Sequence, residues 1–441
     1  MKSVMRSVLL ALPFAVVLAS CNNGPPILSE EEKAARITIN PFQENLTPDP
    51  ELAALPVELP AAAAAANWLQ AGENSTKAPG NVDAAPEFKE AWRANIGEGS
   101  GETKRLVAAP VVKDGRVYTI DSAQKITATE ASSGRRIWEM QIKAGNPQWD
   151  EFSVGGGLAI TGDKLIVASG FGFVAALKLS DGSEIWRRPV ESPLSSSPAI
   201  MGNRAFLTST NNDFYSIDTD TGEIIWNDQA LSETARVLSS PSPAVNADIL
   251  AVGYSSGELI AYLPANGRRL WTDTLTTTGR YTPLSAINDI AGKPTIQDGV
   301  VYAASHSGVL TAIDARSGAR IWSRTFGSRQ GPVIGGDYLF VVGVDGIVAC
   351  FNKVTGKLAW KRALPEFKDG NRENRIVWTG PLIASGKLVV VSSDGDVLAL
   401  SAQNGETVSE LKLGQSILIE PIAAAGKIFI LTDQANLVAI K

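Results

Sequence analysis

Histidine is nearly absent from this sequence: His306 is the only one in 441 residues. A metal cluster built on histidines needs several of them, and a Ser-His-Asp triad needs one held beside two partners. The sequence therefore offers no His-based metal cluster. We expect His306 to be a turn residue rather than a catalytic base.

An excess of positive charge is also missing. Lysine and arginine together number 40 against 46 aspartates and glutamates, which gives a formal net charge of −6. A protein that binds the phosphates of nucleic acid presents a basic face. The charge balance therefore disfavours nucleic acid as a partner.

Cysteine occurs only as Cys21 and Cys350. The two are not adjacent, and neither lies in the motif that attaches a c-type haem. Cys350 stands where the repeats described below have other small residues, so we expect it to be a small buried core residue.

The first twenty residues have the pattern of an export signal. Two basic residues precede an apolar run over 8–18, which is too short to span a bilayer. The run ends in Leu18-Ala19-Ser20-Cys21, which resembles the lipobox of bacterial lipoproteins. The resemblance implies a signal peptide over 1–20 and a lipid on Cys21, and Asn22 favours the outer membrane. With Cys21 acylated no internal disulfide is possible, so the stability of the fold must come from packing.

Residues 21–86 differ in composition from the rest of the chain. Prolines are scattered among polar and small residues, and six alanines run from Ala61 to Ala66. This composition is typical of a tether. Trp68 would be left exposed in a free tether, so we expect its ring to pack on the folded domain.

A glycine four residues before a tryptophan marks an internal repeat. The pairs are Gly134/Trp138, Gly182/Trp186, Gly222/Trp226, Gly267/Trp271, Gly318/Trp322 and Gly356/Trp360, with Gly405/Ser409 as a degenerate seventh copy. Six residues before each glycine stands a small residue, as expected where strands crowd near a propeller axis. These small residues are Ala128, Ala176, Ser216, Ala261, Ala312, Cys350 and Ala399.

Eight turn dipeptides precede short runs with the alternating pattern of strands. They are Asp114-Gly115, Gly162-Asp163, Gly202-Asn203, Ala247-Asp248, Asp298-Gly299, Gly336-Asp337, Gly386-Lys387 and Gly426-Lys427. All but one contain glycine, which supplies the positive φ of a tight hairpin. The pattern therefore predicts that each unit has three strands, a turn at the repeat glycine and a fourth strand that carries the tryptophan.

The eighth unit stops at residues 438–441, before a fourth strand of its own. Residues 88–93 form a lone predicted strand ahead of the first unit, with Trp92 placed like the repeat tryptophans. Pairing of the two would close the ring and remove its exposed edges. We predict an all-β fold over 87–441, an eight-bladed β-propeller of four-stranded antiparallel blades. An open β-solenoid would explain the turns but not the spare strand.

The segment Ala312-Ile313-Asp314-Ala315-Arg316-Ser317-Gly318-Ala319-Arg320-Ile321-Trp322 resembles the tryptophan-docking repeat of the quinoprotein-like propellers. One branch of that superfamily contains dehydrogenases that bind pyrroloquinoline quinone and calcium. The other is the BamB family, to which the lipobox, the tether and the total length are similar. The second resemblance implies a non-catalytic scaffold lipoprotein without a cofactor, on the periplasmic face of the outer membrane. Its partners would be the periplasmic domains of a BamA-like barrel insertase and unfolded outer-membrane proteins.

In that family the partner contacts lie on loops that lead into the first strands of two neighbouring blades. By repeat register, the matching segments here are 235–241 and 280–289. They combine apolar side chains with charges, the mixture expected of an interface centre and its rim. The predicted partner-binding residues are Arg236, Val237, Leu238, Arg280, Tyr281, Leu284 and Asp289.

Two other functions remain open. A quinone-dependent dehydrogenase would need carboxylates that converge on the axis. Asp218 and Asp314 instead recur with the repeat, and we expect them to make turn and cap hydrogen bonds. A propeller lipoprotein that binds some other envelope partner is the third reading.

Overall fold

The computed structural model describes residues 46–144, 153–233, 237, 239, 241–276, 287–369 and 373–441. Nearly all regular structure in them is strand. Helix α2 (Pro50–Ala53) is a single turn, and its N-cap Asp49 accepts hydrogen bonds from the N–H groups of Glu51 and Leu52. Within these ranges, no helix has the length and hydropathy that a membrane span requires.

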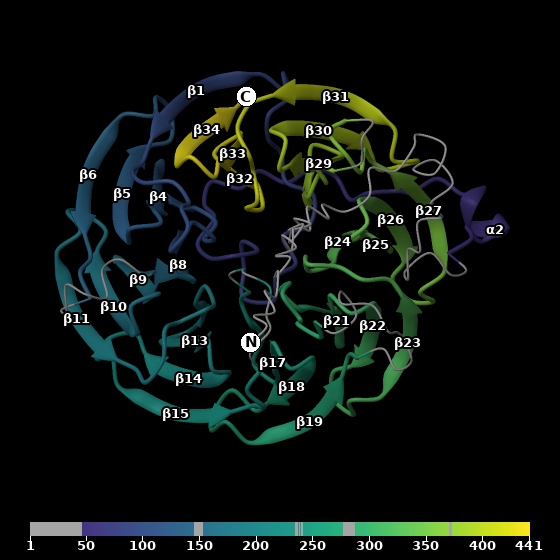
Figure 1. Ribbon diagram of the computed structural model, residues 1–441. Helices are drawn as coiled ribbons and strands as arrows, with labels where there is room; N and C mark the ends of the chain where they lie inside the picture. Colours follow the sequence, from purple (N-terminus) through teal and green to yellow (C-terminus); the bar gives the residue numbers. More distant parts are fainter. Residues whose placement is uncertain are drawn as a thin grey trace, which may run out of the picture. The chain divides into compact units, whose positions relative to one another are not determined.

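Eight four-stranded antiparallel sheets, which we number blade 1 to blade 8, lie around a central axis (Figure 1). From the innermost strand outward, blades 1 and 2 are β3 (Val111–Lys113), β4 (Arg116–Ile120), β5 (Lys125–Glu130), β6 (Arg136–Gln141), then β8 (Gly156–Thr161), β9 (Lys164–Ser169), β10 (Phe173–Lys178), β11 (Glu184–Pro189). Blades 3 and 4 are β12 (Ala199–Met201), β13 (Arg204–Thr208), β14 (Asp213–Asp218), β15 (Ile224–Gln229), then β16 (Ala244–Val245), β17 (Leu250–Gly253), β18 (Glu258–Tyr262), β19 (Arg269–Thr274).

Blades 5 to 7 follow the same plan. Blades 5 and 6 are β20 (Thr295–Gln297), β21 (Val300–Ala304), β22 (Val309–Asp314), β23 (Arg320–Thr325), then β24 (Val333–Gly335), β25 (Tyr338–Val342), β26 (Ile347–Asn352), β27 (Leu358–Ala363). Blade 7 is β28 (Trp378–Ala384), β29 (Lys387–Ser392), β30 (Asp396–Ser401), β31 (Thr407–Lys412). A parallel pair, β2 (Lys104–Arg105) and β7 (Ser153–Val154), joins the connections that enter blades 1 and 2.

Blade 8 is built from both ends of the propeller sequence. Its three inner strands are β32 (Ile422–Ala424), β33 (Lys427–Leu431) and β34 (Asn436–Ile440), and its outermost strand is β1 (Glu90–Asn95). β1 pairs antiparallel with β34, with Trp92 opposite Ala439. The predicted closure of an eight-bladed ring is confirmed, and the open solenoid is excluded.

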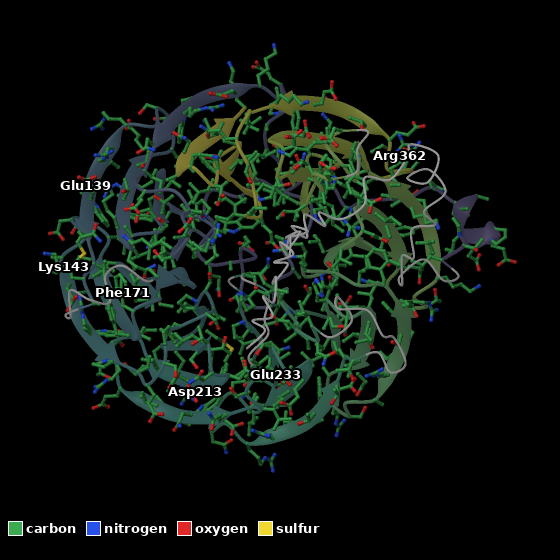
Figure 2. All side chains as sticks on the ribbon, viewed as in Figure 1. Glu139, Lys143, Phe171, Asp213, Glu233 and Arg362 are labelled. Atoms are coloured by element: carbon green, nitrogen blue, oxygen red, sulfur yellow. The ribbon has the colours of Figure 1, made fainter. Side chains whose placement is uncertain are left out.

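The side chains change in character from the axis to the rim. Middle strands such as β5 and β14 are buried on both faces, whereas outermost strands such as β6 and β15 mix exposed and half-buried residues. Figure 2 shows Glu139 of β6 and Arg362 of β27 at the periphery, with Phe171 further in. The ring is therefore held together between the faces of neighbouring blades.

The repeat tryptophans make those contacts. Each indole of an outermost strand stacks on the repeat glycine of the following blade and donates from Nε1 to a backbone carbonyl there. The acceptors are Ala131 for Trp92, Leu179 for Trp138, Thr219 for Trp186, Pro264 for Trp226, Ala315 for Trp271, Lys353 for Trp322 and Ala402 for Trp360, at 2.9–3.1 Å.

The small repeat residues lie elsewhere than the sequence suggested. They belong to the third strand of each blade, not to the axis. Six of them lie directly across from the tryptophan of their own blade, as Ala128 does from Trp138 and Cys350 from Trp360, and Ala399 lies across from Ser409. A large side chain there would compete for space with the indole, so a small residue recurs. Cys350 is fully buried, as expected, and burial raises the pKa of its thiol.

Residues 57–88, which we call the plug, are not a tether. Their backbone hydrogen-bonds to the innermost strands of five blades: Trp68 with Val112, Leu69 with Ile160, Ser75 with Val245, Thr76 with Ile296 and Val82 with Ile383. The predicted packing of Trp68 is confirmed, since only 3% of the residue is exposed. Composition suggested a tether because these contacts use the backbone, which leaves little trace in residue type.

The plug covers one end of the ring. The connections between blades reach the axis where the innermost strands begin, and we call this side of the ring the entry face. The plug binds the opposite ends of the innermost strands, on the side that we call the far face. The axis is therefore closed on the far face and lined by connections on the entry face.

Substitution of a repeat glycine tests the docking between blades. A Cβ at Gly267, where φ is +74°, would lie 2.5 Å from the Trp226 ring, whereas Gly299 has φ +75° and no neighbour within 4 Å. Gly299→Ala should cost about 1–2 kcal/mol of unfolding free energy through its backbone alone. Gly267→Ala should cost about 1–3 kcal/mol more through overpacking, measured by urea unfolding. Equal costs would contradict a tight indole contact.

Removal of the Trp68 side chain tests the plug. Trp68→Ala should lower the free energy of unfolding by about 3–5 kcal/mol and open residues 57–88 to limited proteolysis. Leu55→Ala is the matched control, because Leu55 lies just before the plug and is 57% exposed. A protease pattern that is the same for both variants would contradict a packed plug.

Candidate functional site

The entry face holds the described residues of the two predicted partner loops. Val237, Ser239 and Pro241 lie in the connection that leads into β16 of blade 4, and residues 287–289 lie in the connection that leads into β20 of blade 5. Five of the seven predicted residues, Arg236, Leu238, Arg280, Tyr281 and Leu284, fall outside the described residues, as does Cys21. The structure places the other two, Val237 and Asp289.

A short hydrogen bond joins the two connections. The backbone N–H of Val237 donates to Oδ2 of Asp289 at 2.7 Å. Nearby, the Ser239 hydroxyl donates to the carbonyl of Ala291 at 3.1 Å. The sequence therefore identified two segments that meet in space, although 52 residues separate them.

Asp289 differs from its predicted role as an exposed rim charge. It is only 5% exposed, and its backbone carbonyl accepts a hydrogen bond from the N–H of His306 at 2.9 Å. A carboxylate that accepts backbone N–H bonds stabilises the segments that supply them. Asp289 therefore joins the connection into blade 5 to the connection into blade 4. His306 lies in the turn between β21 and β22, as expected.

Arg329 lies behind this joint and was missed in the sequence. Burial lowers the pKa of its guanidinium, and the charge of Asp289 acts in the opposite direction. Its Nε is buried without a hydrogen-bond partner. Arg329 belongs to the connection into blade 6, outside the repeat register, so no sequence pattern singled it out.

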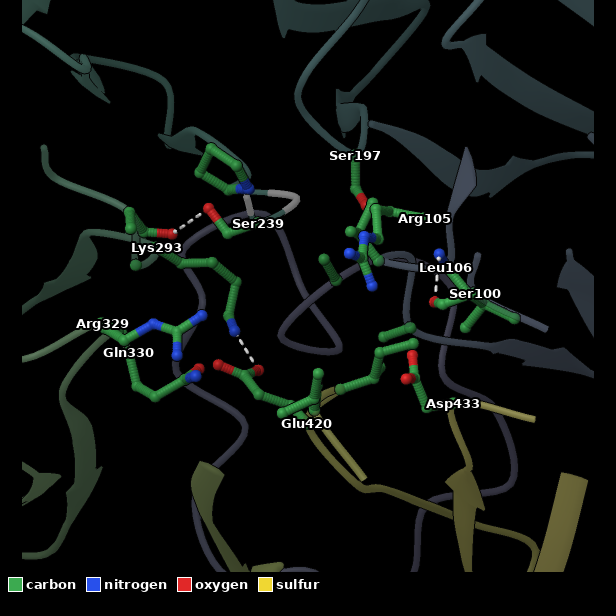
Figure 3. A pocket seen from close by; sticks show the side chains of 18 residues that line it. Ser100, Arg105, Leu106, Ser197, Ser239, Lys293, Arg329, Gln330, Glu420 and Asp433 are labelled. Carbon is green, nitrogen blue, oxygen red and sulfur yellow. Dashed lines mark hydrogen bonds and ion pairs between the residues drawn. The ribbon is translucent and has the colours of Figure 1, made fainter. Parts of the chain in front are cut away.

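A pocket of about 250 Å³ lies at the axis on the entry face, beside the joined loops (Figure 3). We call it the axial pocket. Connections into six different blades contribute to its wall, among them Arg105, Ser197, Ser239, Lys293, Arg329 and Glu420.

The plug supplies the floor of the axial pocket. Ala71 lines it directly. Next to Ala71, the Gln70 side chain bridges to blade 3 by accepting from the N–H of Ile200 at 2.8 Å. Gln70 also accepts a hydrogen bond from Nζ of the buried Lys77 at 3.2 Å. Burial, and then the nearby charge of Lys293, hold the pKa of Lys77 well below its usual value.

The aspartates that recur with the repeat stay in their turns. Oδ1 of Asp218 accepts from the N–H groups of Asp220 and Thr221, and Oδ1 of Asp314 accepts from Ser317. These hydrogen bonds lower the pKa of both carboxyls. In the part of the chain that the structure describes, no three His, Cys, Asp or Glu side chains converge to hold a metal ion.

The family model and the relatives named here share one description. The family model described as outer membrane protein assembly factor BamB matches residues 122–362 and 344–441. The BamB proteins of Salmonella typhimurium and Escherichia coli are 28% and 26% identical, each over 79% of this chain and 88% of its own length. BamB of Burkholderia pseudomallei is 26% identical over 86% of this chain and 96% of its own length.

Solved structures agree on the fold. The crystal structure of BamB from Moraxella catarrhalis has a TM-score of 0.68 at 17% identity, over 80% of this chain and 99% of that one. A quinohemoprotein alcohol dehydrogenase from Comamonas testosteroni has a TM-score of 0.65 at 14% identity, over 86% of this chain and 81% of that one. Both of these structures thus share the propeller fold with this chain, whereas the matching family model is the one described as BamB. The chain belongs to the family of outer membrane protein assembly factor BamB.

Proposed function

We propose that this protein is a non-catalytic scaffold of outer-membrane β-barrel assembly. It is anchored to the periplasmic face of the outer membrane by a lipid on Cys21. It binds the periplasmic domains of a BamA-like insertase and assists the folding of outer-membrane proteins. The observation that carries the proposal is the match to the BamB family model over more than half of the chain.

The geometry of the entry face supports a docking role. The Val237–Asp289 hydrogen bond holds the connections into blades 4 and 5 together before any partner arrives. A surface fixed in advance loses less conformational entropy on binding and so gains affinity. Segments 235–241 and 280–289 therefore make up the proposed insertase interface.

The first experiment is affinity purification of the detergent-solubilised protein from its own envelope, with mass spectrometry of the retained proteins. Stoichiometric recovery of the insertase is expected. Recovery of a different envelope protein in place of the insertase would instead indicate a propeller lipoprotein that binds another envelope partner.

Charge substitutions test the two interface segments. Leu238→Asp and Leu284→Asp should each lower insertase recovery by about tenfold or more, because a buried charge without a partner opposes association. The control is Val354→Asp, since Val354 is 64% exposed in the turn between β26 and β27, on the far face. All three variants should keep the wild-type unfolding midpoint. Full recovery with both leucine variants would remove these loops from the interface.

The two cysteines offer a matched test of anchoring. Cys21→Ser should move the protein from the membrane fraction to the soluble periplasm, because each buried methylene of an acyl chain contributes about 0.8 kcal/mol of membrane binding. Cys350→Ala should leave it in the membrane, since alanine is the usual residue at this repeat position. Membrane retention of the Cys21 variant would show that something other than a lipid holds it.

A further inference from the structure

The axial pocket gathers three cationic side chains from three blades. Arg105 comes from β2 in the connection into blade 1, Lys293 from the connection into blade 5 and Arg329 from the connection into blade 6. Figure 3 shows Arg105 on one side of the pocket, with Lys293 and Arg329 on the other. Such convergence from distant parts of the chain is unlike a solvated run of charge on one surface strand.

The described acidic side chains near the pocket do not form ion pairs with both arginines. Glu420 forms an ion pair with Lys293. Asp433 also lines the pocket, and none of the basic side chains that the structure describes forms an ion pair with it. Asp289 stands behind Arg329, where its Oδ2 accepts from the N–H of Val237. Two guanidinium groups thus line the pocket together with the carboxylate of Asp433.

The two guanidinium groups differ in how they are held. Arg105 is exposed and forms no ion pair with the residues that the structure describes, and the pairing of β2 with β7 fixes its backbone. Arg329 is half-buried, and its Nε has no hydrogen-bond partner. Both guanidinium groups present planar pairs of donors that match a carboxylate or a phosphate.

The plug places a buried amine next to the floor of the pocket. Lys77 is 2% exposed, its Nζ donates to Gln70, and the charges of Lys293 and Glu73 both reach it. Glu73 is the acidic group on the same turn, and burial raises the pKa of its carboxyl. An anion in the pocket would offset the cost of keeping the half-buried Arg329 guanidinium away from bulk water.

We propose that the axial pocket binds an oxyanion, a carboxylate or phosphate group, between the guanidinium groups of Arg105 and Arg329. At about 250 Å³ the pocket is smaller than the sites of roughly 300–1,000 Å³ that hold drug-sized ligands. It therefore suits a small free anion or one acidic side chain of a bound protein. The site stands on residues of this chain and does not depend on the proposed insertase partner.

Isothermal titration of the detergent-solubilised full chain with citrate and with inorganic phosphate tests the site. Citrate should bind the wild type. Arg105→Gln should lower the affinity for citrate by about tenfold, because it removes a charged, bidentate donor. Arg329→Lys keeps the charge but loses the planar fork, and should weaken binding as well. The control is Arg135→Gln, whose side chain is 69% exposed in the turn between β5 and β6 on the far face.

Addition of citrate to the protein captured with its envelope partner separates the two sources of the anion. If citrate releases the partner, the oxyanion is an acidic side chain of that partner. If citrate binds and the partner stays bound, the oxyanion is a free small molecule. The proposal is overturned if neither probe binds the wild type at millimolar concentration. It is also overturned if Arg105→Gln, folded with the wild-type unfolding midpoint, binds citrate as the wild type does.

Discussion

The contact between an indole and the glycine of the next blade determines the rest of this structure. Each blade alone is a four-stranded sheet with two faces to cover, and a neighbour covers them only if the distance between blades is fixed. The tryptophan sets that distance by stacking, and its Nε1–H fixes the angle by donating to a single carbonyl. Glycine is required at the contact because a Cβ there would come within 2.5–2.7 Å of the indole.

One seam of the ring lacks this contact. Blade 7 has Ser409 where the other outermost strands have tryptophan, and it faces blade 8. The third and fourth strands of blade 8 are β34 and β1, which no turn connects, so no glycine turn stands there to receive an indole. Buried apolar residues of blades 7, 8 and 1 pack there with Trp68, Val82 and Phe88 of the plug in one core. The degenerate seventh repeat is thus a consequence of the way the ring closes.

The sequence was sufficient for features that repeat or that depend on local chemistry. The glycine and tryptophan spacing predicted the blades, the turn dipeptides predicted the inner hairpins, and the spare strand at Trp92 predicted closure. The plug could not be predicted, because its contacts are backbone hydrogen bonds to strands far away in sequence. For the same reason Asp289 was expected at the surface, and Arg329 was missed. Their burial depends on how neighbouring connections fold over the axis, which periodicity does not encode.

The pairing of β1 with β34 sets an order of events for a chain that emerges from its amino terminus. Glu90 pairs with Ile440, so the outermost strand of blade 8 must wait for almost the whole propeller to be synthesised. Contacts this distant in sequence form slowly, since a long loop must close before they contribute. The plug binds strands of five blades around the axis and can seat fully only on a finished ring. Full contact between the plug and the innermost strands therefore marks the completion of folding.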